Sequence, residues 1–389
     1  MTSREPVIVG IADAPLQKGI YTGGSVLDMQ ARVAKSALAE AGLTLADVDG
    51  LLTAGVWGVP GPGLFPSITL GEYLGIRPRF ADTTNIGGAA FEAHVAHAAL
   101  AIRQGYCDVA LIVYGSTQRS EKNRSLGGRP TNLTMQFEHI WGIPAPVGSY
   151  ALAAMRHMHE FGTTSEQLAE VAVAARQWAA LNPAATMRTP LSVDDVLASP
   201  MVCDPLHQLD CCLVTDGGGA IVMTSADHAR ALGVRNPIHV RGFGESHSHW
   251  NIAEMPDLAL LSSAEASSRR AMEMAGVTTD DFDIVQVYDS FTITVLMTLE
   301  ALGFCKPGEG GRFVAGQRTA PGGDFPMNTS GGGLSYAHPG MFGIFLLIEA
   351  VRQLRWEAGE RQVPDCKLAL VHGTGGALSS AATCVLSRG

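Results

Sequence analysis

The chain has 389 residues, of which 46% are hydrophobic and 16% are charged, and its formal net charge is −10. This length predicts two or three domains with substantial buried cores. The acidic balance argues against nucleic acid as a partner, because neutralising phosphates needs clustered Lys and Arg side chains and the sequence shows no such cluster.

Strands and helices alternate from the N-terminus onward. Residues 6–12 are a short apolar run that predicts a buried strand. Residues 25–41 predict a helix, because apolar side chains recur at spacings of three and four on one face. Ser25 and Asp28 have the spacing of a helix start, and residues 47–53 lead into a second strand.

The same order of elements returns in the second half of the chain. Gly42 follows the first helix in a position that favours a left-handed residue, and Gly276 follows a predicted helix over residues 264–275 in the same way. Asp47 is matched by Asp281 at the same offset. Blocks that recur in one order predict a β/α unit that is duplicated, with glycine-rich turns opening equivalent helices.

An insertion separates the two halves. It runs from about residue 118 to 205, begins polar and glycine-rich, and contains two helical segments, the second introduced by a capping box from Thr164 to Gln167. We predict an N-terminal half over 1–117 and 206–229, a loop domain over 118–205 and a C-terminal half over 230–389. Such excursions cover an active-site mouth or a subunit interface, and the sequence leaves both open.

One glycine-rich stretch organises the second half, Pro326-Met-Asn-Thr-Ser-Gly-Gly-Gly-Leu-Ser-Tyr-Ala-His-Pro-Gly-Met-Phe-Gly343. Three consecutive glycines allow close approach of a ligand, and Tyr336 and His338 follow at a predicted turn-to-helix junction. Backbone N–H groups and the helix dipole stabilise negative charge at such a junction. The alternative is a glycine-rich connection with a surface histidine.

Cysteine usage and the N-terminus indicate the compartment. The seven cysteines form no Cys-x-x-Cys pair, which predicts neither a disulfide framework nor a metal site. The start of the chain has no signal-peptide pattern, and no apolar run reaches membrane-spanning length. We therefore expect a cytoplasmic protein without a membrane span.

Five short segments match motifs of a known protein family: Asn85-Ile-Gly-Gly-Ala-Ala90, Tyr288-Asp-Ser-Phe291, Asn328 with Gly331 and Gly332, Ala337-His-Pro-Gly-Met-Phe-Gly343, and His372-Gly-Thr-Gly-Gly376. Over essentially its whole length the chain resembles the thiolase superfamily, most closely its branch of sterol-carrier-protein-x-like and lipid-transfer-protein-like members. The resemblance implies the α/β thiolase fold, a duplicated five-layer αβαβα arrangement with a loop-domain insertion in the first half. The duplication seen in the sequence agrees with it.

The departures from the family pattern bear on the chemistry. The resemblance places a nucleophilic cysteine at the start of the helix opened by the Asn85 segment, where this chain has Gly88 or Ala89. Tyr288-Asp-Ser-Phe291 stands where the family commonly has Asn-Glu-Ala-Phe or His-Asp-Cys-Phe, so a phenol replaces a group that supports the oxyanion hole. The His372 segment stands where many thiolases have a second, acid/base cysteine. Without a thiolate there is no obvious covalent acyl carrier.

The retained groups suit a reaction through a thioester enolate. Retro-aldol cleavage of a β-hydroxyacyl-CoA needs a base for the hydroxyl proton, a pocket for the enolate oxygen and an acid for the carbon left behind. The resemblance implies that His338, helix-terminal N–H groups and a water held by Asn328 stabilise the oxyanion, with Tyr288, His372 and Tyr336 as further catalytic candidates. A tyrosine base needs a pKa below its usual value of about 10, which an imidazolium from either histidine would provide.

Backbone positions complete the predicted site. The expected oxyanion and substrate-binding positions are Asn328, Gly88, Ala89, Gly375 and Gly376. His247 and His249 alternate as on a strand and are a further candidate pair for lining the substrate pocket. For Tyr288 and Tyr336 the structural alternative is a packed tyrosine with a bonded hydroxyl group.

We interpret the chain first as a carbon–carbon lyase that cleaves a β-hydroxyacyl-CoA to a ketone or aldehyde and a shortened acyl-CoA. The resemblance points to the steroid side-chain-cleaving aldolases, which lack the nucleophile and work with a DUF35-type partner, an OB-fold with a zinc ribbon. It also implies a bulky acyl group, a homodimer, and coenzyme A as part of the substrate with no tightly bound cofactor.

Two alternatives stay open. One is an acyltransferase of the acetyl-CoA acetyltransferase type with an unusual nucleophile, for which Cys305 is a conceivable thiol. The other is a non-catalytic subunit that binds acyl-CoA, which is favoured if Tyr288, His338 and His372 do not converge.

Overall fold

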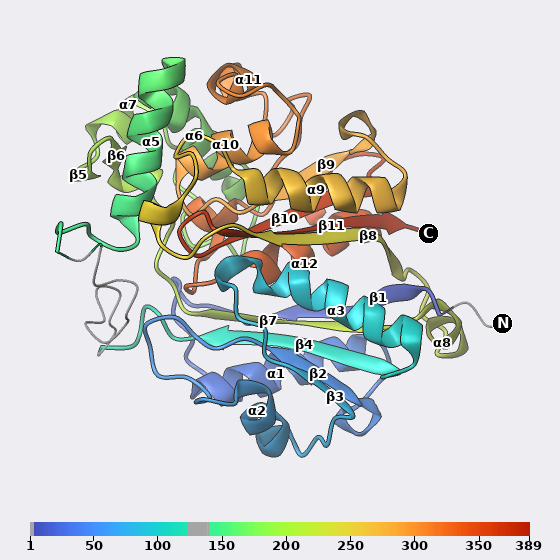
Figure 1. Cartoon of the computed structure of the whole chain (residues 1–389). Coiled ribbons are helices and arrows are strands. Elements are labelled where there is room, and N and C mark those ends of the chain that lie inside the picture. The colour runs from blue at the N-terminus through green and yellow to red at the C-terminus, as the bar shows by residue number, and fades with distance from the viewer. Residues whose placement is uncertain (1–3, 123–137, 139) are drawn as a thin grey trace.

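Five layers that alternate between helix and sheet make up the fold (Figure 1). The computed structural model describes residues 4–122, 138 and 140–389. Helices cover the outer faces of two sheet halves, and two more helices lie between the halves. The predicted αβαβα arrangement is confirmed.

The strands repeat one arrangement in both halves. They are β1 (Pro6–Asp13), β2 (Gly50–Thr53), β3 (Phe80–Asp82), β4 (Val109–Ser116), β5 (Met201–Cys203), β6 (Leu206–His207), β7 (Gly217–Ser225), β8 (Ile238–His247), β9 (Ile284–Val287), β10 (Leu368–Gly375) and β11 (Ser380–Arg388). Nine of them follow the order β3-β2-β4-β7-β1-β8-β11-β10-β9, and β5 pairs with β6. Among the described strands, the two halves of the sheet are joined where Val7 and Ile8 of β1 pair with β8. The parallel pairs β2–β4 and β9–β10 occupy equivalent places.

Helices form three of the five layers and most of the regular structure of the insertion. They are α1 (Val26–Glu40), α2 (Pro66–Leu74), α3 (Ala90–Gln104), α5 (Val147–Phe161), α6 (Ser165–Ala180), α7 (Val193–Ala198), α8 (Ala226–Ala231), α9 (Ser262–Ala275), α10 (Thr292–Ala301), α11 (Gly310–Val314) and α12 (Gly343–Arg355). α1 and α2 cover one outer face, α9 and α10 the other, and α3 and α12 fill the centre (Figure 1). Among the described helices, none combines the length and hydropathy needed to cross a bilayer.

Local signals set several helix ends as predicted. Ser25 caps α1, and its backbone and side chain form a reciprocal capping box with Asp28. Thr164 caps α6 in the same way. Gly42 and Gly276 have φ of +70° and +68°, the left-handed conformation that ends a helix and that glycine adopts without steric cost.

The helix openings in the two halves are not equivalent, which corrects the sequence prediction. A 3-10 turn over Gly87–Ala89 leads directly into α3 at Ala90, whereas residues 329–333 lead only into a π-helical turn over Gly332–Tyr336. Ala337 then returns to an extended conformation, and α12 begins only at Gly343. His338 therefore lies on an irregular segment between two helical turns.

The insertion packs over this irregular segment. Of the predicted loop domain 118–205, residues 123–137 and 139 lie outside the described residues, and α5, α6 and α7 make up most of the rest. α6 lies against the π-helical turn, where the Arg176 guanidinium donates to Ser335 Oγ at 2.9 Å. The described part of the insertion thus forms a wall beside the glycine-rich stretch.

Candidate active site

Tyr288 and His338 are in direct contact between the two sheet halves. The Tyr288 hydroxyl oxygen lies 2.9 Å from His338 Nε2, and the rings meet edge to face with centroids 5.7 Å apart. The backbone N–H of Phe342, just before α12, donates to the same phenol oxygen at 3.1 Å. Two of the predicted catalytic side chains are therefore brought together, beside the first residue of a central helix.

Both members of the pair are neutral near pH 7. Burial raises the pKa of Tyr288 well above its usual range and lowers the pKa of His338 to about 4. The phenol therefore donates to Nε2, and the imidazole carries its own proton on Nδ1. The expectation that an imidazolium lowers the pKa of the tyrosine is wrong, because burial at this depth disfavours both charged forms.

Gly88 provides the space in which the Tyr288 ring lies. A Cβ atom at Gly88 would be 2.1 Å from Cε2 and 2.5 Å from Cζ of that ring. Ala89, the alternative position from the sequence, is fully buried and precedes α3 directly. Where the resemblance implies a nucleophilic cysteine, this chain therefore has a glycine covered by a phenol.

A second glycine turn packs against the first. A Cβ atom at Gly375 would lie 1.7 Å from the carbonyl oxygen of Ile86, and one at Gly87 would lie 2.7 Å from the backbone nitrogen of Gly376. Side chains would prevent this contact between the two backbones. The predicted positions Gly88, Gly375 and Gly376 thus gather beside the phenol, and their proposed role toward a thioester stays a prediction.

Asn328 holds the strand that leads to the phenol. Its Oδ1 accepts from the backbone N–H of Val287 at 2.8 Å, and its Nδ2 donates to the Val287 carbonyl at 2.9 Å. The residue itself adopts φ of +50°, which asparagine tolerates better than most residues. The amide is committed to the backbone of β9 at both ends, so this structure does not favour the predicted role of holding a water.

His372 lies on the opposite face of β10 from Tyr288. Its Nδ1 bonds to Thr383 Oγ1 at 2.8 Å, and that hydroxyl contacts Ser267 on the outer helix α9 at 3.0 Å. Burial lowers the pKa of His372 to about 3, and its Nε2 has no partner among the described residues. The expected convergence of three groups is wrong, because side chains alternate along a strand and Gly373 takes the inward place.

Tyr336 points toward the end of β1. Its hydroxyl donates to Asp13, whose carboxylate pairs with Arg352 at 2.6 Å. Although burial disfavours the charge, Arg352 keeps the pKa of Asp13 below its usual range, and burial together with that carboxylate raises the pKa of Tyr336. This bonding fits the structural alternative, in which Tyr336 fixes the glycine-rich stretch to the first half of the chain.

The two candidate pocket histidines lie at the far end of β8. His247 is exposed and pairs with Ser380 of β11. His249 is partly buried, and its Nε2 lies 3.0 Å from the carbonyl of Ala377, next to the second glycine turn. His249 therefore borders the site, whereas His247 lies on the surface.

Two residues that support the site were missed at the sequence level. Asp289 accepts the backbone N–H groups of Gly333 at 2.6 Å and Leu334 at 3.2 Å, and burial raises its pKa to about 6. Two sequence features could have pointed to Asp289: it follows Tyr288 directly, and a run of glycines elsewhere in the chain offers backbone N–H groups to a carboxylate. Thr215 binds both backbone groups of His338, at 2.9 and 3.2 Å, and no sequence signal marks it.

One thiol lies near the phenol. The backbone of Cys212 donates to the Ser290 carbonyl at 2.9 Å, and a charge on its sulfur would raise the pKa of Tyr288. Burial raises the pKa of Cys212 itself well above its usual range. It is therefore a protonated thiol, the weakly nucleophilic form.

Cys305, the other candidate thiol, lies in the outer core, and burial raises its pKa to about 12.

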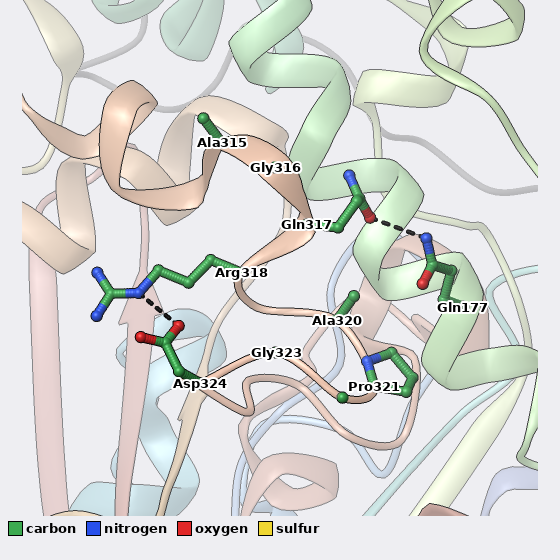
Figure 2. Close-up of a pocket in the computed structure, with 10 residues that line it drawn as sticks. Gln177, Ala315, Gly316, Gln317, Arg318, Ala320, Pro321, Gly323 and Asp324 are labelled. Atoms are coloured by element: carbon green, nitrogen blue, oxygen red, sulfur yellow. Dashed lines mark hydrogen bonds and ion pairs between the residues drawn. The ribbon is translucent and has the colours of Figure 1, made fainter.

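A surface pocket of about 500 Å³ is lined by other residues (Figure 2). Gln177 of α6 and the segment 315–324 line it, and no predicted site residue is among them. Gln177 bonds to Gln317 at 3.0 Å, and Arg318 pairs with Asp324 at 2.8 Å. The two charged side chains of this pocket pair with each other, and none of the predicted catalytic groups lines it. We therefore assign the chemistry to the Tyr288–His338 pair.

The fold and this site define a thiolase-type protein with neither family cysteine at the site. The family model described as "Thiolase, N-terminal domain" matches residues 6–227, and "Thiolase C-terminal domain-like" matches residues 244–388. The chain belongs to the thiolase family.

Named relatives include both transferases and lyases. The chain is 32% identical over 395 residues to an acetyl-CoA acetyltransferase of Methanothermobacter thermautotrophicus, covering 99% of this chain and 100% of that protein. It is 35% identical over 368 residues to a 17-hydroxy-3-oxo-4-pregnene-20-carboxyl-CoA lyase of Mycobacterium tuberculosis, covering 91% and 92%. A steroid side-chain-cleaving aldolase of Thermomonospora curvata is 31% identical over 389 residues, with 95% of each chain covered.

Solved structures show the same fold. The "Ltp2-ChsH2(DUF35) aldolase" matches with a TM-score of 0.87 and 28% identity, covering 100% of this chain and 99% of that chain. Human mitochondrial 3-ketoacyl-CoA thiolase matches with a TM-score of 0.70 at 16% identity, covering 99% of both chains.

Proposed function

We propose that this chain is a thiolase-like aldolase that cleaves a β-hydroxyacyl-CoA to a ketone or aldehyde and a shortened acyl-CoA. The observation that carries the proposal is the phenol of Tyr288, which covers Gly88 and bonds to His338 at 2.9 Å. A proton-transfer pair thus occupies the place of the acyl carrier. Retro-aldol cleavage needs such a pair and needs no covalent intermediate.

The pair works as a relay. The phenol oxygen takes the proton of the substrate β-hydroxyl while its own proton moves to His338 Nε2, which is free to accept because the ring is neutral. The Cα–Cβ bond breaks, its electron pair forms the thioester enolate, and the β carbon becomes the new carbonyl. The proton held by His338 then returns through the phenol to the enolate carbon.

The surroundings suit a developing negative charge. The N–H of Phe342 donates to the phenol oxygen. It stabilises the negative charge that develops on this oxygen as one proton leaves and the next arrives. The imidazolium formed on His338 lies beside the enolate at that moment. The thioester oxygen is held by backbone N–H groups at the start of α3 and at the turn containing Gly375 and Gly376.

The substrate and partner follow from the relatives. The lyase and aldolase that resemble this chain are named for steroid acyl-CoA and steroid side-chain chemistry, which supports a bulky, ring-bearing acyl group. The structure with TM-score 0.87 includes a DUF35 protein in its name, which supports an OB-fold partner. Coenzyme A is then part of the substrate, no other cofactor is required, and a homodimer in the cytoplasm is the expected state.

The test is a product assay. Purified protein, with and without a co-encoded OB-fold protein, is incubated with a panel of β-hydroxyacyl-CoA thioesters. A free ketone or aldehyde together with a shortened CoA ester supports the lyase. Failure to cleave any member of a panel that includes ring-bearing acyl groups, with the partner present, contradicts it.

A second candidate is acyl transfer. The 32% identical acetyltransferase and the Cys212 thiol near the phenol favour it. It predicts an acyl-enzyme that mass spectrometry traps on Cys212 after incubation with acetyl-CoA, and a new carbon–carbon bond in the product. We rank it second because burial keeps this thiol protonated.

A further inference from the structure

Glu92 places a carboxyl group directly behind the glycine turn. It lies on α3 one helical turn after Gly88 and is fully buried. A Cβ atom at Gly343 would be 2.4 Å from Glu92 Oε2 and 2.3 Å from the carbonyl oxygen of Gly88. One at Gly373 would be 2.3 Å from Oε2. The chain therefore omits side chains at the start of α12 and on the inward face of β10, where this carboxyl group lies.

In the part of the chain that the structure describes, no charged group acts on this carboxyl group to keep it ionised. Both oxygens lack a hydrogen-bond partner among the described residues, and burial raises the pKa of Glu92 to about 8. On β11 the nearest titratable group is Cys384, whose thiol donates to the Glu92 carbonyl at 3.5 Å and whose pKa burial also raises. β10 presents Gly373, α12 presents Gly343, and Tyr288 lies on the other side of Gly88.

A neutral acid in this place has one O–H group to donate. The Gly88 carbonyl oxygen is a nearby acceptor, since it and Oε2 would lie 2.3 and 2.4 Å from a Cβ atom built at Gly343. No hydrogen bond joins the two in this structure, so the donation requires the carboxyl group to rotate toward that oxygen. Gly88 is also the residue against which the Tyr288 ring packs.

We propose that Glu92 is a positioning residue of the active site, whose un-ionised carboxyl group supports the Gly88 carbonyl from behind and so holds the glycine turn against the Tyr288 ring. The inference rests on the proposed lyase function and adds a residue to it. Ionised Glu92 would withdraw the donor and place a buried anion near the developing enolate, so it would both release the turn and oppose the reaction.

The experiment compares Glu92→Gln, Glu92→Leu and wild type in kcat and KM from about pH 6 to 10, with Glu273→Gln on the exposed face of α9 as a matched control. Wild-type kcat should fall as pH rises through about 8. Glu92→Gln, which keeps an N–H donor, should lose this fall and retain most of kcat at pH 7. Glu92→Leu should lower kcat by about ten- to a hundredfold with little change in KM.

Two results overturn the inference: wild-type kcat in Glu92→Leu, or an alkaline fall that persists in Glu92→Gln. A second readout needs no substrate. Because the folded-state pKa of Glu92, about 8, lies above its ordinary 4.5, its stabilising contribution is complete below pH 4.5 and is lost as pH rises to about 8.

The unfolding temperature of wild type relative to Glu92→Gln should therefore fall over that window and level off above it. A difference that does not change with pH contradicts the inference whatever the activity. If wild type cleaves no thioester yet shows this pH dependence, the proposed function fails and the neutral burial of Glu92 stands.

Discussion

An imidazole lies on each side of β10, and the two have different surroundings: His338 is partly buried and His372 is fully buried. On the inward side, His338 accepts from the hydroxyl of Tyr288, and the Tyr288 ring packs on the glycine turn at Gly88. On the outward side, His372 bonds to Thr383, whose hydroxyl is tied onward to α9. Both imidazoles are neutral because of burial. Two features separate them: the inward imidazole bonds to a phenol, a second proton-transfer group, and it is partly exposed, whereas His372 is fully buried.

The largest expected effect comes from removing the inward hydroxyl group. Tyr288→Phe should lower kcat by about 10²- to 10⁴-fold, the usual worth of a positioned proton-transfer group. The free energy of unfolding should fall by only about 1 kcal/mol, since the ring still fills the space at Gly88 and only the bonds of the hydroxyl are lost. Steady-state kinetics and urea unfolding measure the two.

Tyr106→Phe is the matched control, because Tyr106 is 68% exposed at the end of α3 and should change neither quantity. Turnover of Tyr288→Phe close to that of wild type would remove the phenol from the mechanism and leave the two faces of β10 equivalent.

A smaller effect should follow from filling the space at Gly88. Gly88→Ala would place a Cβ atom 2.1 Å from the Tyr288 ring, so the ring or the turn has to move. We expect a loss of about 1–3 kcal/mol in the free energy of unfolding, as for other overpacked sites, and a lower kcat. Gly55→Ala is the control, because its Cβ would meet only the Asn85 side chain, at 3.2 Å. An unchanged kcat in Gly88→Ala would show that the phenol need not pack on the turn.

Local sequence signals predicted the scaffold better than the site. The caps at Ser25 and Thr164 and the left-handed Gly42 depend on neighbouring residues alone, and the structure confirms them. The face that His372 presents depends on strand parity, where a shift of one residue exchanges inward and outward sides. The start of α12 was also missed, since the extended Ala337 that delays it is set by tertiary contacts.

Charge states in the site depend on depth, which spacing does not reveal. A histidine two residues from Tyr336 and next to a proline gives no sign that burial lowers its pKa to about 4. Glu92 lies on a helix rich in alanine, and the packing of Gly343 and Gly373 around its carboxyl group brings the burial that raises its pKa to about 8. These properties arise from contacts between segments that are distant in sequence.

The smallest effect is expected on the outward face. His372→Leu keeps a similar volume and removes an Nε2 that has no partner among the described residues, but it leaves the Thr383 hydroxyl with Ser267 alone. These changes oppose each other, so the free energy of unfolding should stay within about 1 kcal/mol of wild type. The ring bonds to Thr383 on the far side of the strand, and His372 reaches Tyr288 through its backbone carbonyl, which the substitution keeps. We therefore expect kcat to remain within about threefold of wild type, far above the Tyr288→Phe value. A loss of kcat as large as that of Tyr288→Phe would mean that the outward imidazole takes part in the reaction, and the contrast between the two faces would then fail.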